Sequence, residues 1–348
     1  MLQTSQRIEY LDVLRIAATF AVIFLHVSSG RYRQASFLSF NWYIAMIYES
    51  LVRWAVPIFI MISGAMFLNP DRVVSLREIY RKRIPRLLLA YIFWWIFYSV
   101  FRMVGNAVME GAFSFKLGYL LPHFHLWFLP MIIVVYALIP LLRRFSHDEK
   151  LTKYALALWM CYVTGQFLLP IICQYIGIDQ IPQISPLFAA NQAVGYAGYF
   201  LLGYYLFHHS IAQHQCRFIY LLGTVGLAVT IAGNIVLSLL DNQPNEHFFS
   251  NLSLHTILVA IALFVFIKQH SHRWTTWIRP FSNHVRKDLF GIYLTHAVFL
   301  SLVHPLFING IIPHFILSIP IFSMVIFILS LYTTKTIRII PFFRKFVE

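Results

Sequence analysis

Ten apolar stretches, each close to the length needed to cross a bilayer, constrain this chain more than any other feature. They cover roughly residues 11–29, 43–68, 84–104, 125–142, 154–177, 191–207, 217–240, 252–267, 287–304 and 312–333. A transmembrane helix needs about 20 predominantly apolar residues. Helices satisfy their own backbone hydrogen bonds, which lipid cannot do. The sequence therefore predicts an all-α, polytopic transmembrane helix bundle of about ten spans.

Composition and charge support a membrane protein and give its orientation. The 348 residues are 59% hydrophobic and 11% charged, with a mean hydropathy of +0.70, which lies outside the soluble globular range. The net charge of +14 would suggest nucleic acid in a soluble protein. Here 21 of the 27 Lys and Arg residues fall in alternate loops on one side, against only Arg31, Arg33 and Lys116 on the other. The positive-inside rule then predicts that both termini are cytoplasmic and explains the charge without nucleic acid.

The chain reads as a single integral-membrane domain over residues 1–348. Its longest polar gap, residues 69–83, is too short to enclose a second core, and no repeat is visible. Three cysteines, Cys161, Cys173 and Cys216, show neither a disulfide framework nor a metal-ligand spacing. We therefore expect no metal.

Arg15 and His26 are ionisable residues at the two ends of the first apolar stretch, LRIAATFAVIFLH. Such side chains are costly in a bilayer and usually face a bundle interior or a water-filled cavity. The spacing places them about 20° apart around a helix and about 16.5 Å apart along it. Arg15 alone is also compatible with snorkelling to the headgroups, and His26 alone with a structural interior histidine. Their shared face favours a site for a long polar ligand, in which His26 can exchange a proton near neutral pH.

A basic segment, IYRKRIPRLLLAY, leads into the third apolar stretch. Arg81 and Lys82 fit an ordinary positive-inside cluster. Arg83 and Arg86 are three positions apart, so they share a helix face that continues into the membrane. Because planar guanidinium groups match phosphate oxygens, we predict that Arg83 and Arg86 converge with Arg15 on an anionic ligand.

Glu49 and Arg53 precede a proline-containing stretch, WAVPIFIMISGAMFL. They are one helical turn apart, a spacing that predicts an internal ion pair. Pro57 is expected to kink the helix and to free backbone groups, which is tolerable where neighbours or a cavity satisfy them.

Histidine and aromatic residues mark two further stretches. HFHLWFLP contains His125 and Trp127. An aromatic belt at the membrane surface accounts for Trp127 but not for His125, which we expect in the same outer half as His26. GIYLTHAVFL buries Tyr293 and His296, for which a structural role is the simpler interpretation. We group these four, with the ion pair above, as candidate acceptor-binding or supporting residues.

Six motifs, in order along the chain, carry a resemblance to a known family. They are RIAATFAVIFLH, VPIFIMISGAMFL, RIPR, HLWFL, YFLLGYYL and GIYLTHAVFL. The chain resembles the acyltransferase-3 family of integral-membrane acyltransferases over essentially its whole length. Within that family it looks most like the stand-alone sugar O-acetyltransferases, such as the one that acts on enterobacterial common antigen.

The resemblance implies a reaction and roles for four residues. An acyl group, usually acetyl from cytoplasmic acetyl-CoA, would pass to a hydroxyl of an extracytoplasmic glycan or lipid-linked sugar at the bacterial inner membrane. His26 would be the catalytic histidine, and Arg15, Arg83 and Arg86 would hold the CoA phosphates. A base suits the step, because the hydroxyl must lose its proton as it attacks the thioester. Direct transfer is preferred, since no serine or cysteine is recognisably placed as a nucleophile; an acyl-histidine intermediate stays open.

A different class of function is also compatible with the sequence. A secondary transporter or exporter of a glycan precursor would have ten helices and internal charges, although no inverted repeat is visible. A non-catalytic scaffold would not need buried ionisable residues. We expect no resident cofactor, acetyl-CoA as co-substrate, a surface glycan or lipid-linked sugar and membrane lipids as partners, and no nucleic acid; a homo-oligomer stays open.

Overall fold

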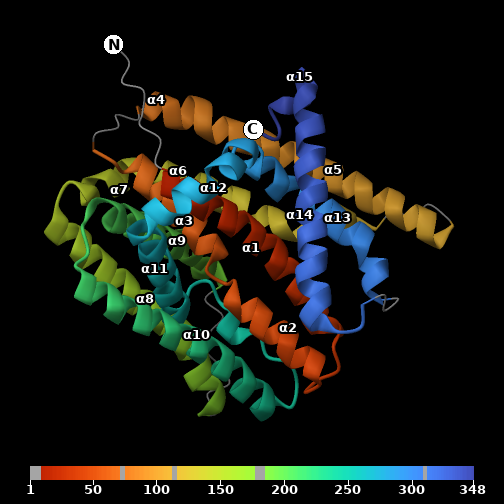
Figure 1. Cartoon of the computed structure of the whole chain (residues 1–348), viewed down its shortest axis with the longest axis horizontal. Coiled ribbons are helices and arrows are strands. Elements are labelled where there is room, and N and C mark those ends of the chain that lie inside the picture. Colours follow the sequence, from red (N-terminus) through yellow and green to blue (C-terminus); the bar gives the residue numbers. More distant parts are fainter. Residues whose placement is uncertain (1–8, 71–74, 112–115, 177–184, 309–311) are drawn as a thin grey trace.

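A computed structural model describes residues 9–70, 75–111, 116–176, 185–308 and 312–348, and these residues form helices with no β-strand among them (Figure 1). The α-helices are α1 (Glu9–Gln34), α2 (Phe40–Leu51), α3 (Ala55–Phe67), α4 (Leu76–Glu78), α5 (Ile84–Glu110), α6 (Phe128–Ala137), α7 (Ile139–Ser146), α8 (Glu149–Tyr175), α9 (Ser185–His208), α10 (Gln213–Asp241), α11 (Leu254–Gln269), α12 (Ser271–Val285), α13 (Leu289–Ile308), α14 (Phe315–Ile339) and α15 (Pro341–Arg344). Short 3-10 or π-helical turns are η1 (Ile79–Arg83), η2 (Leu117–Leu120), η3 (Phe124–Trp127) and η4 (His247–Phe249). The predicted all-α class is confirmed.

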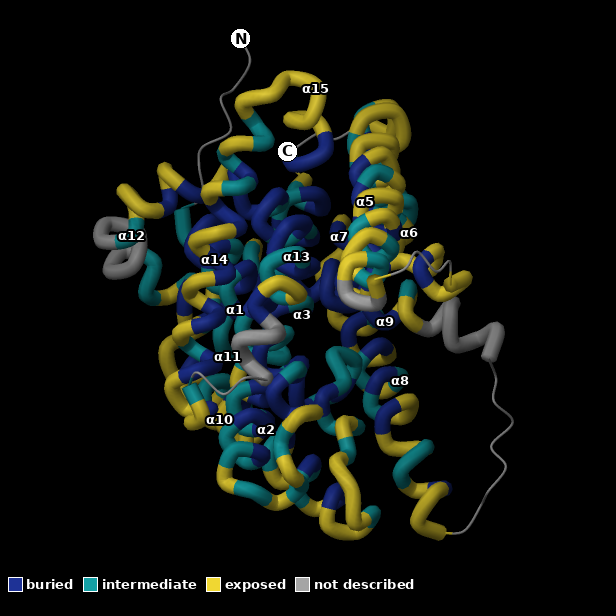
Figure 2. The backbone as a smooth tube through the Cα atoms, turned by 90° about the vertical axis from the view of Figure 1, so that its right-hand side faces the viewer, coloured by how far each residue is buried: buried dark blue, intermediate teal, exposed yellow. Residues whose placement is uncertain are grey.

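The apolar helices account for the membrane character. Seven helical segments in the described part of the chain are long and apolar enough to cross a membrane, and eight if α6 and α7, bent by 57°, form one crossing. The two remaining predicted stretches coincide with α9 and the shorter apolar α13. Much of helix α5 is exposed (Figure 2), and its exposed apolar residues include Leu88, Ile92, Ile96, Val100 and Val104, which form a stripe along the helix. In a protein of this composition such a stripe is a lipid-facing surface.

Helix α1, which carries Arg15 and His26, is the central element of the bundle (Figure 1). It packs against α2, α3, α11, α12, α13 and α14. Leu11 and Leu14 join a buried cluster with residues of α3, α9 and α11. Ile23 and Val27 join a second cluster with residues of α2 and α14. The two ends of α1 are therefore fixed by different sets of neighbours, which sets the rotation of the helix.

Two glycines allow α3 and α9 to touch backbone to backbone. A Cβ on Gly64 would lie 1.7 Å from the carbonyl oxygen of Phe200, and a Cβ on Gly203 would lie 2.0 Å from that of Met61. Small residues at such crossings let transmembrane helices approach closely. This crossing fixes the C-terminal half of α3.

Pro57 breaks the second apolar stretch, as its sequence predicts. Residues 52–54 separate α2 from α3, and Pro57 is the third residue of α3. A proline ring clashes with the carbonyl of the residue four positions earlier, here Arg53. Since the first four N–H groups of a helix have no intrahelical partner, Pro57 costs α3 no hydrogen bond. Glu49 therefore lies in the last turn of α2, and Arg53 lies in the three-residue break before α3.

The C-terminal residues lie beside α5 at one end of the bundle. Arg86, near the start of α5, donates to the backbone oxygen of Glu348, and Trp94 Nε1 donates to that of Phe346 at 3.0 Å. The connection between α10 and α11 lies at the opposite end (Figure 1). Which end faces the cytoplasm stays a prediction.

Candidate active site

A cavity of about 710 Å³ runs along one face of α1. That helix contributes Arg15, Val22, His26, Gly30 and Arg33 to the lining. These positions are three, four or seven residues apart, which places them on one side of an α-helix. The two ionisable residues of the first motif therefore open onto the same space, about 16.5 Å apart along the helix.

His26 is held by ring contacts and not by hydrogen bonds. Its imidazole stacks on that of His296 with a centroid distance of 5.3 Å and an interplanar angle of 17°. It also meets the Phe124 ring in an edge-type contact, with the centroids 4.8 Å apart. No hydrogen bond joins the His26 ring to another residue that the structure describes, and the side chain lines the cavity. A neutral imidazole in this position can accept a proton from a bound ligand.

His296 is buried behind His26 and has a defined tautomer. Its Nδ1 lies 2.6 Å from the carbonyl oxygen of Tyr293. Because a carbonyl oxygen only accepts, Nδ1 carries the proton and Nε2 of the neutral ring has the lone pair. That Nε2 is buried and finds no partner among the described residues. The His296 ring also meets the His125 ring at 5.1 Å, so three imidazoles are in contact in series.

His125 and His123 extend this array towards the loop before η3. Their Nδ1 atoms are 2.9 Å apart, so one ring donates to the other. The Tyr293 hydroxyl donates to the His125 carbonyl oxygen. Burial lowers the pKa of His123 to about 4, and the positive charge of Arg102 acts in the same direction. A neutral His123 matches a hydrogen bond between two imidazoles, in which one nitrogen must be unprotonated.

A second cavity of about 340 Å³ gathers the three predicted ligand arginines, Arg15, Arg83 and Arg86. Arg83 ends the π-helical turn η1 and Arg86 lies in the first turn of α5, directly after Pro85. Ser63 and Tyr136 add hydroxyl groups to the lining. Three fixed cations and two hydroxyls suit an anion with several oxygens.

Arg15 and Arg83 are oriented by the protein and keep N–H donors to spare. Arg15 donates to Asp12 Oδ1 and Met66 Sδ, both at 2.9 Å. Arg83 donates twice to Glu78 Oε1, at 2.8 and 3.2 Å. A guanidinium has five N–H donors, so at least three remain on each for a bound anion.

The two cavities adjoin. Four residues line both of them, namely Arg15, Phe59, Phe128 and Phe290. The shared lining is one cation and three aromatic rings. A ligand that is anionic at one end and apolar along its length can therefore extend from the arginines to His26.

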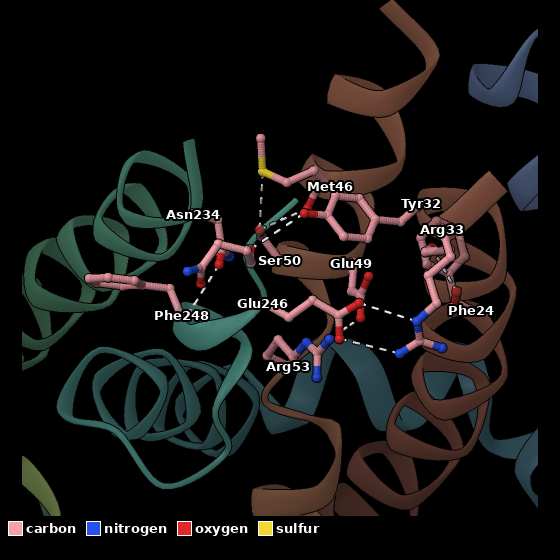
Figure 3. Close-up of polar contacts among 12 residues, drawn as sticks. Phe24, Tyr32, Arg33, Met46, Glu49, Ser50, Arg53, Asn234, Glu246 and Phe248 are labelled. Carbon is pink, nitrogen blue, oxygen red and sulfur yellow. Dashed lines mark hydrogen bonds and ion pairs between the residues drawn. The ribbon is translucent and has the colours of Figure 1, made fainter. Parts of the chain in front are cut away.

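Two ion pairs lie at the far end of the larger cavity, where Figure 3 shows their four side chains close together. Glu49 pairs with Arg53, as their spacing predicts. Arg33 binds both carboxylate oxygens of Glu246, each at 3.2 Å. All four residues line the cavity. They join α1, the α2–α3 break and the connection between α10 and α11.

Trp127 and Tyr293, the other predicted supporting residues, also line the larger cavity. The Trp127 ring lies 5.7 Å from that of Tyr196. A position at the membrane surface, which the sequence allows for Trp127, does not account for a ring that faces an internal cavity. Aromatic walls offer flat apolar surfaces to a bound ligand.

Some lining residues were not singled out from the sequence as site residues. Arg33 is seven positions after His26, so helical spacing could have found it. Glu246 lies in the connection between α10 and α11, and Phe124 begins the short helical turn η3; no spacing within one helix relates either residue to His26. Within the described residues, no group of three His, Cys, Asp or Glu side chains is arranged to hold a metal ion.

Comparison with known proteins identifies the family. The acyltransferase-3 family, described as an acyltransferase domain, matches residues 8–335. The chain belongs to this family. No match was found among the curated proteins or among the solved structures. With its long apolar helices, this acyltransferase-3 protein is an integral-membrane acyltransferase, and the two adjoining cavities are the candidate sites for its donor and acceptor.

Proposed function

We propose that this acyltransferase moves an acetyl group from cytoplasmic acetyl-CoA to a hydroxyl of an extracytoplasmic glycan or lipid-linked sugar. The observation that carries the proposal is the adjoining pair of cavities, with Arg15, Arg83 and Arg86 in one and His26 in the other. The arginines match the CoA phosphates in charge and shape. The aromatic lining between them and His26 suits the uncharged pantetheine arm.

In the proposed reaction His26 is the general base. A His26 ring nitrogen takes the proton of the acceptor hydroxyl while the oxygen attacks the thioester carbonyl carbon. The carbon–sulfur bond then breaks, and the CoA thiolate receives the proton from the His26 imidazolium. The ring stack with His296 holds the His26 imidazole in orientation throughout. The motifs shared with stand-alone sugar O-acetyltransferases support the choice of acceptor and of the bacterial inner membrane.

The test incubates the purified protein with labelled acetyl-CoA and glycolipids extracted from membranes that lack the protein. It measures the free CoA released and the labelled acetyl transferred to the glycolipids. His26→Gln should lower transfer by about 10²- to 10⁴-fold, the usual contribution of a general base, while acetyl-CoA affinity is retained. His214→Gln is the matched control, because His214 is exposed at the start of α10 and lines neither cavity.

Two results would contradict the proposal. One is wild-type turnover by His26→Gln. The other is acetyl-CoA left intact by the wild-type protein while a glycan precursor moves across the membrane, which would identify a transporter.

A further inference from the structure

Glu49 lies in the wall of the larger cavity and has a buried carboxylate oxygen without a partner among the described residues. The residue is 0% exposed and lies in the wall of the cavity that contains His26. Arg53 binds Oε1, whereas Oε2 finds no hydrogen-bond donor in the described part of the chain. Leaving a buried charged acceptor unsatisfied is costly. Arg53 Nε, in the same ion pair, is likewise buried without a partner in the described residues, so the pair leaves one acceptor and one donor for a group that can both donate and accept a hydrogen bond, as a hydroxyl does.

The neighbouring acidic residue differs in this respect. Both oxygens of Glu246 are engaged by Arg33, and its side chain is 40% exposed. Glu49 is held firmly from one side, because the Arg53 guanidinium is also covered by the Phe249 ring at 4.3 Å. Oε2 therefore belongs to a carboxylate that Arg53 holds in place, and Figure 3 shows the two side chains together.

The surroundings of Oε2 select the kind of donor. A carboxylate accepts N–H or O–H groups, and a charged amine would be the usual partner. The two positive charges of Arg33 and Arg53 are already balanced by Glu246 and Glu49 (Figure 3), so a further cation would add an uncompensated charge. A neutral hydroxyl makes the same charge-assisted hydrogen bond without that repulsion. The ring of Trp127 and the edge of Phe124 line the same space and suit the C–H faces of a sugar ring.

We propose that Glu49 Oε2 binds a second hydroxyl of the acceptor sugar while His26 deprotonates the first. The acceptor is then a polyhydroxylated ring and not an alcohol with a single hydroxyl. Glu49 acts as the specificity-determining residue, and Arg53 positions it. This inference rests on the proposed function, since it assigns the acceptor of the same reaction.

The test compares two acceptors for acetyl-CoA. One is the glycolipid fraction extracted from membranes that lack the protein, and the other is water, which has no second hydroxyl on a ring. Glu49→Gln should reduce transfer to the glycolipids by about 10- to 150-fold, the value of one charge-assisted hydrogen bond. Hydrolysis by water should be unchanged.

A matched control and a paired variant separate recognition from folding. Glu149→Gln removes the acid of an exposed i,i+4 pair with Lys153, away from both cavities, and should leave both reactions unchanged. The double variant Glu49→Met/Arg53→Met removes the whole buried pair, a replacement that proteins often tolerate. It should keep hydrolysis and lose transfer to the glycolipids.

Three outcomes would overturn the proposal. They are wild-type transfer by Glu49→Gln, recovery of both reactions in the double variant, and parallel loss of both reactions in the single and the double variant. The last two would make Glu49 a purely structural residue. If the wild-type protein releases no CoA with either acceptor, the proposed function itself fails, which is a separate result.

Discussion

The arginine cavity gives the sharpest quantitative prediction, because Arg83 has a natural control two residues away. Arg83 and Arg81 lie on the same π-helical turn. Arg83 lines the cavity with Arg15 and Arg86, whereas Arg81 is exposed and lines neither cavity. Replacing each by alanine removes the same charge from the same segment. Only the Arg83 variant should lose a contact with the donor.

The expected size follows from the contacts of Arg83. Two of its five donors are used on Glu78, which leaves three for a phosphate. Loss of one charge-assisted hydrogen bond costs about 1.5–3 kcal/mol, so acetyl-CoA should bind Arg83→Ala about 10- to 150-fold more weakly. Arg81→Ala removes an exposed charge worth at most about 1 kcal/mol, or about fivefold. The double variant Arg83→Ala/Arg86→Ala should fall short of the sum, because both residues reach the same ligand.

Calorimetric titration of acetyl-CoA into the detergent-solubilised protein measures these differences. Raising the salt concentration should remove most of the Arg81 effect and little of the Arg83 effect, since exposed charges are screened more strongly. Arg83→Lys should recover only part of the affinity, because an ammonium lacks the bidentate fork. Equal affinities for wild type and Arg83→Ala, or equal losses in the two alanine variants, would refute the phosphate site.

Three further predictions concern stability and orientation. Gly64→Ala forces α3 and α9 apart, because its Cβ would lie 1.7 Å from the Phe200 oxygen. We expect thermal unfolding to show a free energy of unfolding lower by about 1–3 kcal/mol. Gly105→Ala should lose no stability, because nothing lies within 4 Å of a Cβ there. The folded-state pKa of His123 is about 4, below the unfolded value of about 6.5. The unfolded chain therefore binds the proton first as the pH falls, and the free energy of unfolding should decrease by about 3 kcal/mol between pH 6.5 and pH 4. His123→Asn should flatten this part of the plot of stability against pH. An unaltered plot would contradict the lowered pKa of His123. In intact cells, a membrane-impermeant maleimide should label Gln243→Cys and spare Lys345→Cys; the opposite pattern would reverse the predicted orientation.

Local features of the site could be predicted from the sequence, because they depend on spacing within one helix. Arg15 and His26 face one cavity since eleven residues bring them to the same side of α1. The Glu49–Arg53 pair follows from a separation of one turn. The break before Pro57 follows from the clash of its ring with the preceding turn.

Contacts between helices could not be predicted from the sequence. The stack of His296 on His26 joins residues 270 positions apart, and Arg33 binds Glu246 across 213 positions. The two cavities adjoin only because particular faces of four helices, α1, α3, α6 and α13, meet. These faces carry the residues that line both cavities, Arg15, Phe59, Phe128 and Phe290.

The sequence by itself determined that the chain is a helical membrane protein, where its ionisable residues lie along each helix, and which family it resembles. Only the tertiary structure decided which of those residues meet. The physical reason is that a transmembrane helix is apolar on its lipid-facing and on its buried sides alike, so hydrophobic periodicity does not reveal its rotation. That rotation is set by close contacts such as the crossing of Gly64 and Gly203 between α3 and α9, and these exist only once the bundle has formed.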